Sequence, residues 1–524
     1  MRGFWRGRIV IKRFSRCIAF FVLCSGFGHA QNKLSLQPYH WVFDYANELL
    51  LRNQVPLAGW ATQPLNFGDM AQVLESNVPG KYADFLSNRI AQHLYGYVRS
   101  GERQLENPVL QMGALFIEKH GSMVGNDRFL SSVRWFSGLR FSENLTIFNA
   151  IDVDQNFGND KAYLGKSWRD ITALTEQAYI KYQTQKVQIK FGRDYIRWGC
   201  GYDAALAVSD ASRPFDQLFF QLRSRRAQFS YFISKLNSLK LFTSADSIQE
   251  AWVDRYMSGG RIELYLFGNR VQLALSQFIL WGGAHGMEFY YLNPFVIYHG
   301  EQLNEDPEIR GNSLGLFDFA WFPRKRMEVY GQVLIDDFQI DSKEPADLEP
   351  SEVGIMLGTR YADPAGIDGL TLGVEYTRVT NRTYNTMPEA EKYVHRNKPV
   401  GHFLGNDFDR WIVYGTKFLP CDLLVNAHID IRRHGEGRVD GEFDTPWMAY
   451  DIDEGYDEPF PSGLVEYSQI YELGLRWHPK SFIYLSLIGR AGNVLNFDNR
   501  HDEMRIRREL YLKLWFEWSR FWEI

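Results

Sequence analysis

From about residue 108 to its C-terminus, the chain repeats stretches in which apolar and polar side chains alternate. In 510–517, for example, leucines stand at 510, 512 and 514, with Lys513 and other polar or large residues between them. Successive side chains of a β-strand point to opposite faces, so each stretch gives a sheet one apolar and one polar face. Many such stretches in succession are typical of a barrel that crosses a membrane with its strands.

Short turns and longer polar loops alternate between the stretches, and their order predicts the topology. Tight turns favour proline, glycine and asparagine, and these residues mark several of the breaks. Turns are expected near 142–144, 184–185, 224–225, 268–269, 323–325, 364–368, 420–421 and 479–480. Loops are expected at 119–128, 154–172, 198–215, 237–256, 282–311, 339–351, 380–408, 434–464 and 492–504.

Nine loops and eight turns connect 18 strands, so the predicted fold is all-β: a transmembrane antiparallel β-barrel of about 18 strands. The strand count is off by two if the apolar stretch 288–298 forms another strand. A soluble β-sandwich also alternates, but polar faces rich in charged residues favour a water-filled interior over a dry core. The face expected to meet lipid carries Leu372, Val374, Val425, Ile429, Leu512 and Leu514.

Residues 1–30 have the pattern of a secretory signal peptide. Six basic residues precede the apolar stretch 17–23, and residues 1–30 contain no acidic residue. Gly28-His29-Ala30 offers a cleavage site. An uncleaved anchor is the alternative, but the apolar stretch is too short to span a bilayer. Removing the leader leaves 52 basic against 63 acidic residues, about −11 in net charge, which argues against nucleic acid as a partner.

Residues 31–105 indicate a small helical domain ahead of the barrel at 106–524. Apolar residues recur at helical spacing in three sets, which begin at Val42, Phe67 and Tyr82. We expect this domain on the periplasmic side, where it plugs the lower mouth or contacts export machinery. A closed barrel satisfies its own strand edges, so the domain is expected to be dispensable for barrel closure.

The two cysteines outside the leader test this topology. Cys421 lies in an expected periplasmic turn and Cys200 in an expected external loop. The apolar band of such a barrel is about 25 Å tall, which is far beyond the reach of a disulfide. Two unpaired thiols are therefore expected.

The sequence offers no recognisable catalytic set. It lacks G-x-S-x-G, H-E-x-x-H, a phosphate-binding loop and a paired-cysteine metal motif. His285, His299, His402 and His428 share no metal-ligand spacing. We predict no enzyme activity, no metal and no cofactor.

Three clusters combine aromatic, charged and small residues. In Gly192–Asp203 a strand enters an expected external loop, and the plainer interpretation is a strand end with an interfacial tryptophan. Phe289–His299 is rich in aromatics, and the plainer interpretation is a loop that folds inward and packs on itself. Tyr330–Phe338 ends in two acids at the external rim, which are more often solvated or salt-bridged.

The order of these clusters carries a resemblance. Gly-Arg-x-x-x-x-Trp-Gly-x-Gly from Gly192, the Asn293-Pro294 loop, Tyr330–Phe338 and then Gly401–Asp407 together resemble the Wzi-type capsule-assembly outer-membrane family, in its Bacteroidetes-like long form. Cys200 departs from the proline expected in Trp-Gly-Pro-Gly. The resemblance implies an 18-stranded barrel in the outer membrane of a Gram-negative bacterium, a periplasmic helical bundle and a lectin-like role.

Three functions remain open. The first is a lectin-like barrel that attaches or assembles capsular polysaccharide or exopolysaccharide at the cell surface, with outer-membrane lipid and export machinery as further partners. The second is a diffusion porin or solute channel, and the third is an enzyme acting on lipid or glycan. For the first, flat aromatic faces suit sugar rings, and charged or amide groups suit hydroxyls and uronic acids. The candidate ligand contacts are Asp194, Arg197, Trp198, Trp281, Tyr290, Tyr291, Asn293, Asp336 and Asp337.

Overall fold

The structure is a computed structural model that describes residues 34–524 apart from short gaps, the longest of which are 70–85 and 95–107. The predicted signal peptide and Cys421 lie outside the described residues. Cys200 is a free thiol, as predicted.

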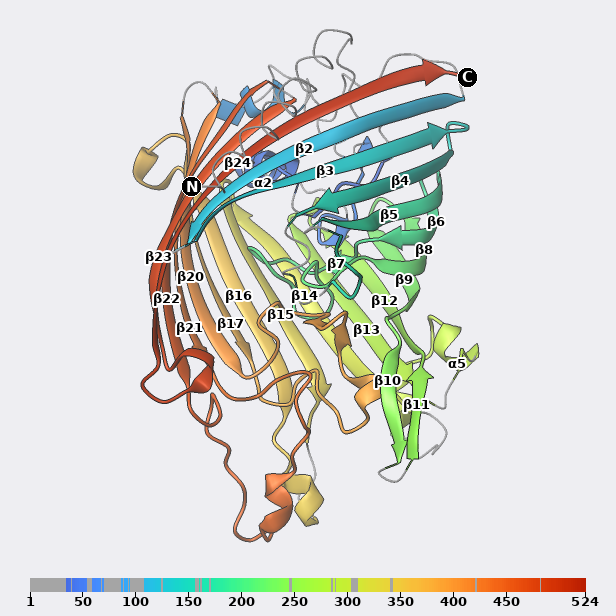
Figure 1. Cartoon of the computed structure of the whole chain (residues 1–524), viewed down its shortest axis with the longest axis vertical. Helices are drawn as coiled ribbons and strands as arrows, with labels where there is room; N and C mark the ends of the chain where they lie inside the picture. Colours follow the sequence, from blue (N-terminus) through green and yellow to red (C-terminus); the bar gives the residue numbers. More distant parts are fainter. Residues whose placement is uncertain are drawn as a thin grey trace.

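Eighteen strands close into one antiparallel barrel, in which the first, β2, pairs with the last, β24 (Figure 1). This confirms the predicted fold class and strand number. The strands are β2 (Val109–Met123), β3 (Asn126–Arg140), β4 (Leu145–Asp154), β5 (Thr172–Gln183), β6 (Val187–Asp194), β8 (Phe215–Arg223), β9 (Ala227–Lys235), β12 (Arg255–Leu266), β13 (Val271–Gly282), β14 (Asn312–Arg324), β15 (Met327–Asp337), β16 (Glu352–Ala362), β17 (Leu370–Val379), β20 (Phe408–Leu419), β21 (Leu423–His434), β22 (Glu466–Lys480), β23 (Ile483–Leu495) and β24 (Met504–Glu523).

Seven of the eight predicted turns connect neighbouring strands at one end of the barrel, here called the turn end; the eighth, 420–421, lies outside the described residues, between the paired strands β20 and β21. Gly268 and Asn269 have φ of 67° and 68°, the left-handed conformation that tight hairpins require. The opposite end, here the loop end, carries the long connections. Short turns face the periplasm and long loops face outward in such barrels, which orients the chain.

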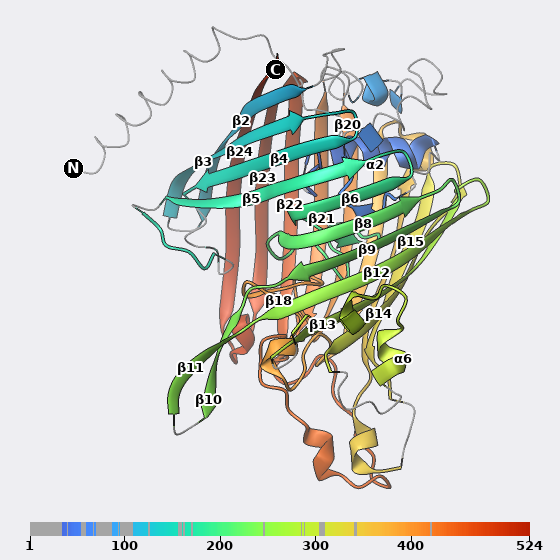
Figure 2. The ribbon, with the colours of Figure 1, turned by 90° about the vertical axis from the view of Figure 1, so that its right-hand side faces the viewer.

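Several predicted loops are wrong in detail. The loop expected at 119–128 is a continuation of β2 and β3, which pair up to Met123 and Asn126. Within the loop expected at 237–256, β10 (Leu239–Ser244) and β11 (Ser247–Val253) form a hairpin that extends past the barrel rim (Figure 2). The loop expected at 492–504 begins only after Leu495. Outside the membrane a strand no longer needs an apolar face, so the pairing continues where the alternation stops.

The stretch 288–298 does not form another strand. It contains the short helix α5 (Phe289–Leu292), and α6 (Tyr298–Gln302) begins near its end. In the described residues of the other loop-end connections there are four 3-10 helices and a small hairpin of β18 (Val394–His395) and β19 (Lys398–Pro399). None of the helices in the described part of the chain is long and apolar enough to cross a membrane.

The predicted lipid face is the outer face. Leu372, Ile429, Leu512 and Leu514 are 40–46% exposed on the barrel exterior. Charged side chains turn inward and pair with one another. Arg261, for example, contacts Asp318 at 2.5 Å with both side chains fully buried.

The N-terminal residues lie inside the barrel at its turn end. Helix α2 (Val42–Asn53) packs with Leu34, Leu36 and Leu65 against inward-facing wall residues such as Trp515 (Figure 1). Arg52 at its end donates two 2.7 Å hydrogen bonds to Asp363 in a turn. Of the two further predicted helices only parts are described, and Gly68, Asp69, Leu86, Ser87, Arg89–Gln92 and Leu94 are helical there.

The connection from β6 to β8 also lies inside the barrel and not in an external loop, which corrects the prediction for 198–215. We call residues 195–214 the inward-folded segment. Its strand β7 (Arg197–Trp198) pairs with β1 (Thr62–Gln63) of the N-terminal region. Apolar residues of the segment join inward-facing Phe219, Phe232 and Phe278 in a buried cluster, so the interior at this level is a packed core and not the predicted water-filled lumen.

Candidate functional site

Three predicted site residues lie in the barrel interior. Asp194 is fully buried and its carboxylate contacts Lys190 Nζ at 2.6 Å. Trp198 is fully buried in the apolar cluster, and the Arg197 guanidinium donates to the Gly201 carbonyl at 3.1 Å. Their side chains stabilise the inward-folded segment, and a contact with ligand at these positions stays a prediction.

Three more, Tyr290, Tyr291 and Asn293, belong to a loop that lies on the outer wall, and Trp281 is an outward residue near the end of β13. The rings of Trp281 and Tyr291 are buried and stacked, with centres 4.4 Å apart. Tyr290 is half-buried and Asn293 is exposed. The loop is packed by its own aromatics, as the plainer interpretation expected, but it folds outward over the strands and not inward.

The two acids of the third cluster differ in environment. Asp336 is buried and accepts a 2.6 Å hydrogen bond from the Tyr384 amide of the 380–408 loop. Asp337 is exposed at the rim. Asp336 thus positions a loop, whereas Asp337 remains open to solvent.

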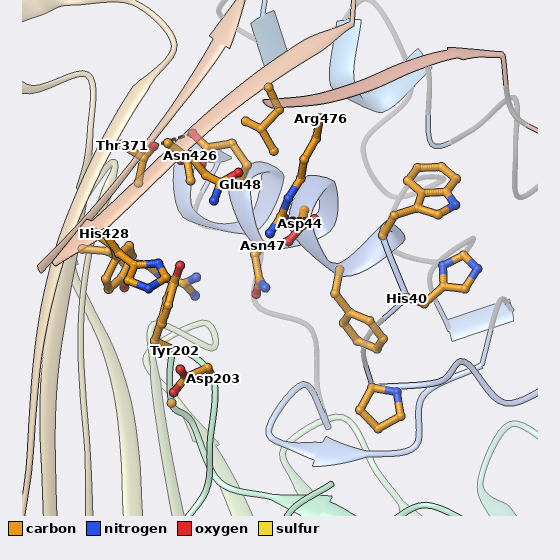
Figure 3. Close-up of a pocket in the computed structure, with 18 of the residues that line it drawn as sticks. His40, Asp44, Asn47, Glu48, Tyr202, Asp203, Thr371, Asn426, His428 and Arg476 are labelled. Carbon is orange, nitrogen blue, oxygen red and sulfur yellow. Dashed lines mark hydrogen bonds and ion pairs between the residues drawn. The ribbon is translucent and has the colours of Figure 1, made fainter. Parts of the chain in front are cut away.

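A cavity of about 480 Å³ lies between α2, the inward-folded segment and the inner faces of β15–β17 and β20–β24. Figure 3 shows α2 on one side of it and Tyr202 and Asp203 on the other. The walls carry aromatic, charged and amide groups, among them Trp41, Asp44, Asn47, Glu48, Trp60, Tyr202, Asp203, Tyr330, Arg360, Tyr414, Asn426, His428, Arg476, Tyr484, Arg490 and Trp515.

Hydrogen bonds and ion pairs fix most of these polar groups. Arg476 contacts Asp44 at 2.5 Å, and Glu48 accepts a 2.6 Å hydrogen bond from the Thr371 hydroxyl. These contacts tie α2 to β22 and to β17, which lies three strands away in the barrel wall. Ion pairs and hydrogen bonds within the protein therefore hold α2 against the wall of the cavity.

The inward-folded segment completes the chamber from the other side. The Tyr202 ring stacks on Tyr414 at 3.9 Å, and Asp203 accepts hydrogen bonds of 2.6 and 2.7 Å from Arg410. Burial alone would raise the pKa of the Asp203 carboxyl, but the Arg410 guanidinium outweighs burial and holds that pKa below its usual value. The segment is thus locked to the wall by a charged pair.

At the loop end, residues 343–350 and 443–458 meet and extend farthest from the barrel (Figure 1); we call them the loop-end tip. Buried Arg382 holds the tip, with contacts of 2.8 Å to Asp444 and 2.7 Å to Glu458 and its guanidinium over the Trp447 ring. Tyr450 and Tyr456 lie 5.3 Å apart between ring centres. The exposed residues around them are mostly acidic, including Glu442, Asp451, Asp453, Glu454 and Asp457.

The tip and the α2 side of the cavity were missed by the sequence reasoning. Both had signals: the 434–464 loop is long and rich in aromatics and acids, and α2 carries Asp44 and Glu48 within an apolar helix. Among the described residues, no group of three or more His, Cys, Asp or Glu side chains is arranged to hold a metal ion.

Fold and interior together define a class: an outer-membrane β-barrel with an apolar exterior, whose interior is occupied by its own chain. A family model described as capsule assembly protein Wzi matches residues 100–506. The chain belongs to this Wzi capsule-assembly family.

The sequence and fold were also compared with solved structures, of which the first shows the same fold. Wzi of Escherichia coli, described as a carbohydrate-binding β-barrel involved in group 1 capsule assembly, is 15% identical, with a TM-score of 0.59 over 95% of this chain and all of that chain. OprD of Pseudomonas aeruginosa is 10% identical with a TM-score of 0.45, over 79% of this chain and 97% of that chain. None of the curated proteins compared with the sequence matches it.

Proposed function

We propose that this barrel binds capsular polysaccharide or exopolysaccharide at the cell surface and holds it there without covalent chemistry. The main support is that this chain, a member of the capsule-assembly family, has a filled barrel interior. At its loop end, ion pairs such as Arg382–Glu458 hold a polar surface in place. The carbohydrate binding described for the Escherichia coli relative supports the same role.

The filled interior is evidence against the alternative function, a diffusion channel. The N-terminal region occupies the turn end, and the inward-folded segment crosses the barrel above it. Hydrogen bonds join the segment to β15 and to the 380–408 loop, for instance from the Leu206 amide to Gln332 and from the Ser209 amide to the Val400 carbonyl. A solute would have to displace both layers to pass.

The loop-end tip supplies groups that suit a sugar chain. Tyr450 is 42% exposed, and it offers a flat face beside Tyr456. Neighbouring carboxylates accept hydrogen bonds from sugar hydroxyls. Because Arg382 fixes the loop that carries them, these groups are held in place before the ligand arrives, which lowers the entropic cost of binding.

The other two partners are assigned to other surfaces. The apolar outer face contacts outer-membrane lipid. The turn end, where α2 lies, faces the periplasm and is the side on which export machinery would meet the barrel.

The test compares Tyr450→Ala combined with Tyr456→Ala against Tyr182→Ala, an exposed tyrosine at the turn end. Both variants should reach the outer membrane as folded, heat-modifiable barrels. The tip variant should release polysaccharide into the medium, whereas the control should retain it on the cells. If the polysaccharide stays bound while uptake of small solutes falls, the channel function replaces the proposed one.

A further inference from the structure

The outer wall of β12–β14 is divided into two parts. Near the turn end its outward residues are apolar and open to lipid, and Ile262, Leu264 and Leu275 are 44–66% exposed. Toward the loop end the outward positions include five small or polar residues beside Tyr256, Ile279 and Trp281: Ser258, Gly260, Gln277, Ser313 and Gly315. Such residues would leave a gap in the apolar belt that a transmembrane barrel needs.

Residues 289–302 of the loop between β13 and β14 cover this gap from the outside. The Gln277 side chain donates to the Val296 carbonyl at 2.6 Å and accepts from the Tyr298 amide at 3.4 Å. The Ser258 and Tyr298 hydroxyls are 3.2 Å apart, and a side chain on Gly260 would meet the Pro294 carbonyl. The polar wall positions are thus satisfied by the loop and removed from lipid.

The inner side of the loop is a packed interface. Tyr291 and Tyr298 are both 1% exposed and form a cluster with Ile279 and Trp281 of β13 and Ile233 of β9. The Tyr231 hydroxyl of β9 donates to the Tyr291 carbonyl at 3.2 Å. The loop is therefore docked on the wall, and Figure 1 shows α5 beside the barrel and outside it.

The outer side of the loop is apolar and uncovered. Phe295 is 76% exposed although its ring stacks on Phe229 of β9 at 5.6 Å, and Ile297 is 70% exposed. Phe229 pairs with Ile262, where the lipid-exposed residues of β12 begin. The exposed apolar side chains of the loop therefore continue the belt toward the loop end, where small and polar residues interrupt the apolar wall.

We propose that residues 289–302 form a membrane-embedded surface that inserts Phe295 and Ile297 among the acyl chains of the outer leaflet. The apolar belt of the barrel then continues over the loop instead of over the wall strands. Continuity with the lipid-exposed belt favours acyl chains over a second copy of the chain as the occupant. The proposal does not depend on polysaccharide binding.

Collision accessibility of a nitroxide label tests it in the full-length protein reconstituted in phospholipid vesicles. Labels are attached to Phe295→Cys and, separately, Ile297→Cys, in a chain whose four native cysteines, Cys17, Cys24, Cys200 and Cys421, are replaced by alanine. Leu275→Cys provides the lipid-facing reference and Tyr450→Cys the aqueous reference. Heat-modifiable migration confirms that each labelled barrel is folded.

Labels at 295 and 297 should collide with oxygen more than with a water-soluble nickel complex, as at 275 and in contrast to 450. Nickel accessibility at both positions equal to that at 450 would overturn the proposal, because the loop would then lie in water. Protection from both reagents, with dipolar broadening between copies, would also overturn it and assign the surface to a second copy.

Discussion

Leu473 provides the sharpest test of how the barrel sits in the membrane. It lies on the outer face of β22, is 58% exposed, and pairs with Ala427 and Gly489, which leave it open to lipid. Tyr467 and Trp477 stand on the same face of the strand, toward its loop end and turn end, and both are exposed. Aromatic residues in these positions mark the two membrane interfaces.

The depth of Leu473 follows from strand geometry. A strand rises about 3.4 Å per residue and is tilted by roughly 40°, so each residue advances about 2.6 Å along the membrane normal. Leu473 is then about 10 Å from the level of Trp477 and about 16 Å from that of Tyr467, close to the centre of a band about 25 Å tall. Gln469, also outward and exposed, is only about 5 Å from the level of Tyr467.

Leu473→Arg should therefore destabilise the barrel by about 2–4 kcal/mol and Gln469→Arg by about 0–1 kcal/mol. Both substitutions place the same charge on the same strand and face, so only depth differs. Urea titrations of protein folded in lipid vesicles, followed by tryptophan fluorescence, give the two free energies of unfolding. Equal costs for the two variants would refute the assigned face or depth.

Three further predictions concern the interior and the loops. Arg52→Met leaves Glu48 and Asp363 without their buried partner and should weaken docking of α2 by about 3–5 kcal/mol. Faster proteolysis of the N-terminal region would report this loss. The control is Arg89→Met, which removes a half-exposed pair with Asp422 and should cost about 0–1 kcal/mol. Burial and the Arg410 charge lower the pKa of His402 to about 3, so this imidazole stays neutral in the folded state while it protonates in the unfolded chain below about pH 6.5. Stability should fall by up to about 1.4 kcal/mol per pH unit as pH drops below that value, and His402→Gln should reduce the slope of the urea midpoint between pH 7 and 5; an unchanged slope would contradict the assignment. Deleting residues 31–100 should leave a closed, heat-modifiable barrel because the strand edges remain paired, and loss of the folded band would show that the two parts are interdependent.

The strand pattern was predictable because lipid and turn geometry act locally on the sequence. Each outward side chain must be apolar within the membrane, and each tight turn needs residues such as Gly268 and Asn269. These constraints predicted the strand number, the lipid face and the seven turns that lie within the described residues. They end at the membrane surface, so the extensions of β2 and β3 past the rim had no signal in the alternation.

The positions of the loops depended on long-range contacts that the sequence pattern does not reveal. Residues 195–214 carry the glycines and charges of an exposed loop, yet Trp198 and Leu206 are fully buried in the apolar cluster inside the barrel. The 289–302 loop was recognised as self-packed, but its outward direction follows from small residues such as Gly260 on a strand far from it in sequence. The candidate ligand residues were chosen for their chemistry, and the structure therefore places them in three separate regions: the interior, the outer wall and the rim.

Direct binding tests the central claim, that this barrel holds surface polysaccharide through its loop end. The full-length protein in lipid nanodiscs is titrated with the purified surface polysaccharide of its own cell, and calorimetry records the heat of binding. Saturable binding by the native chain and by Tyr182→Ala, with loss of binding in the Tyr450→Ala, Tyr456→Ala variant, is the predicted result. Absence of saturable binding by the folded native protein would contradict the account.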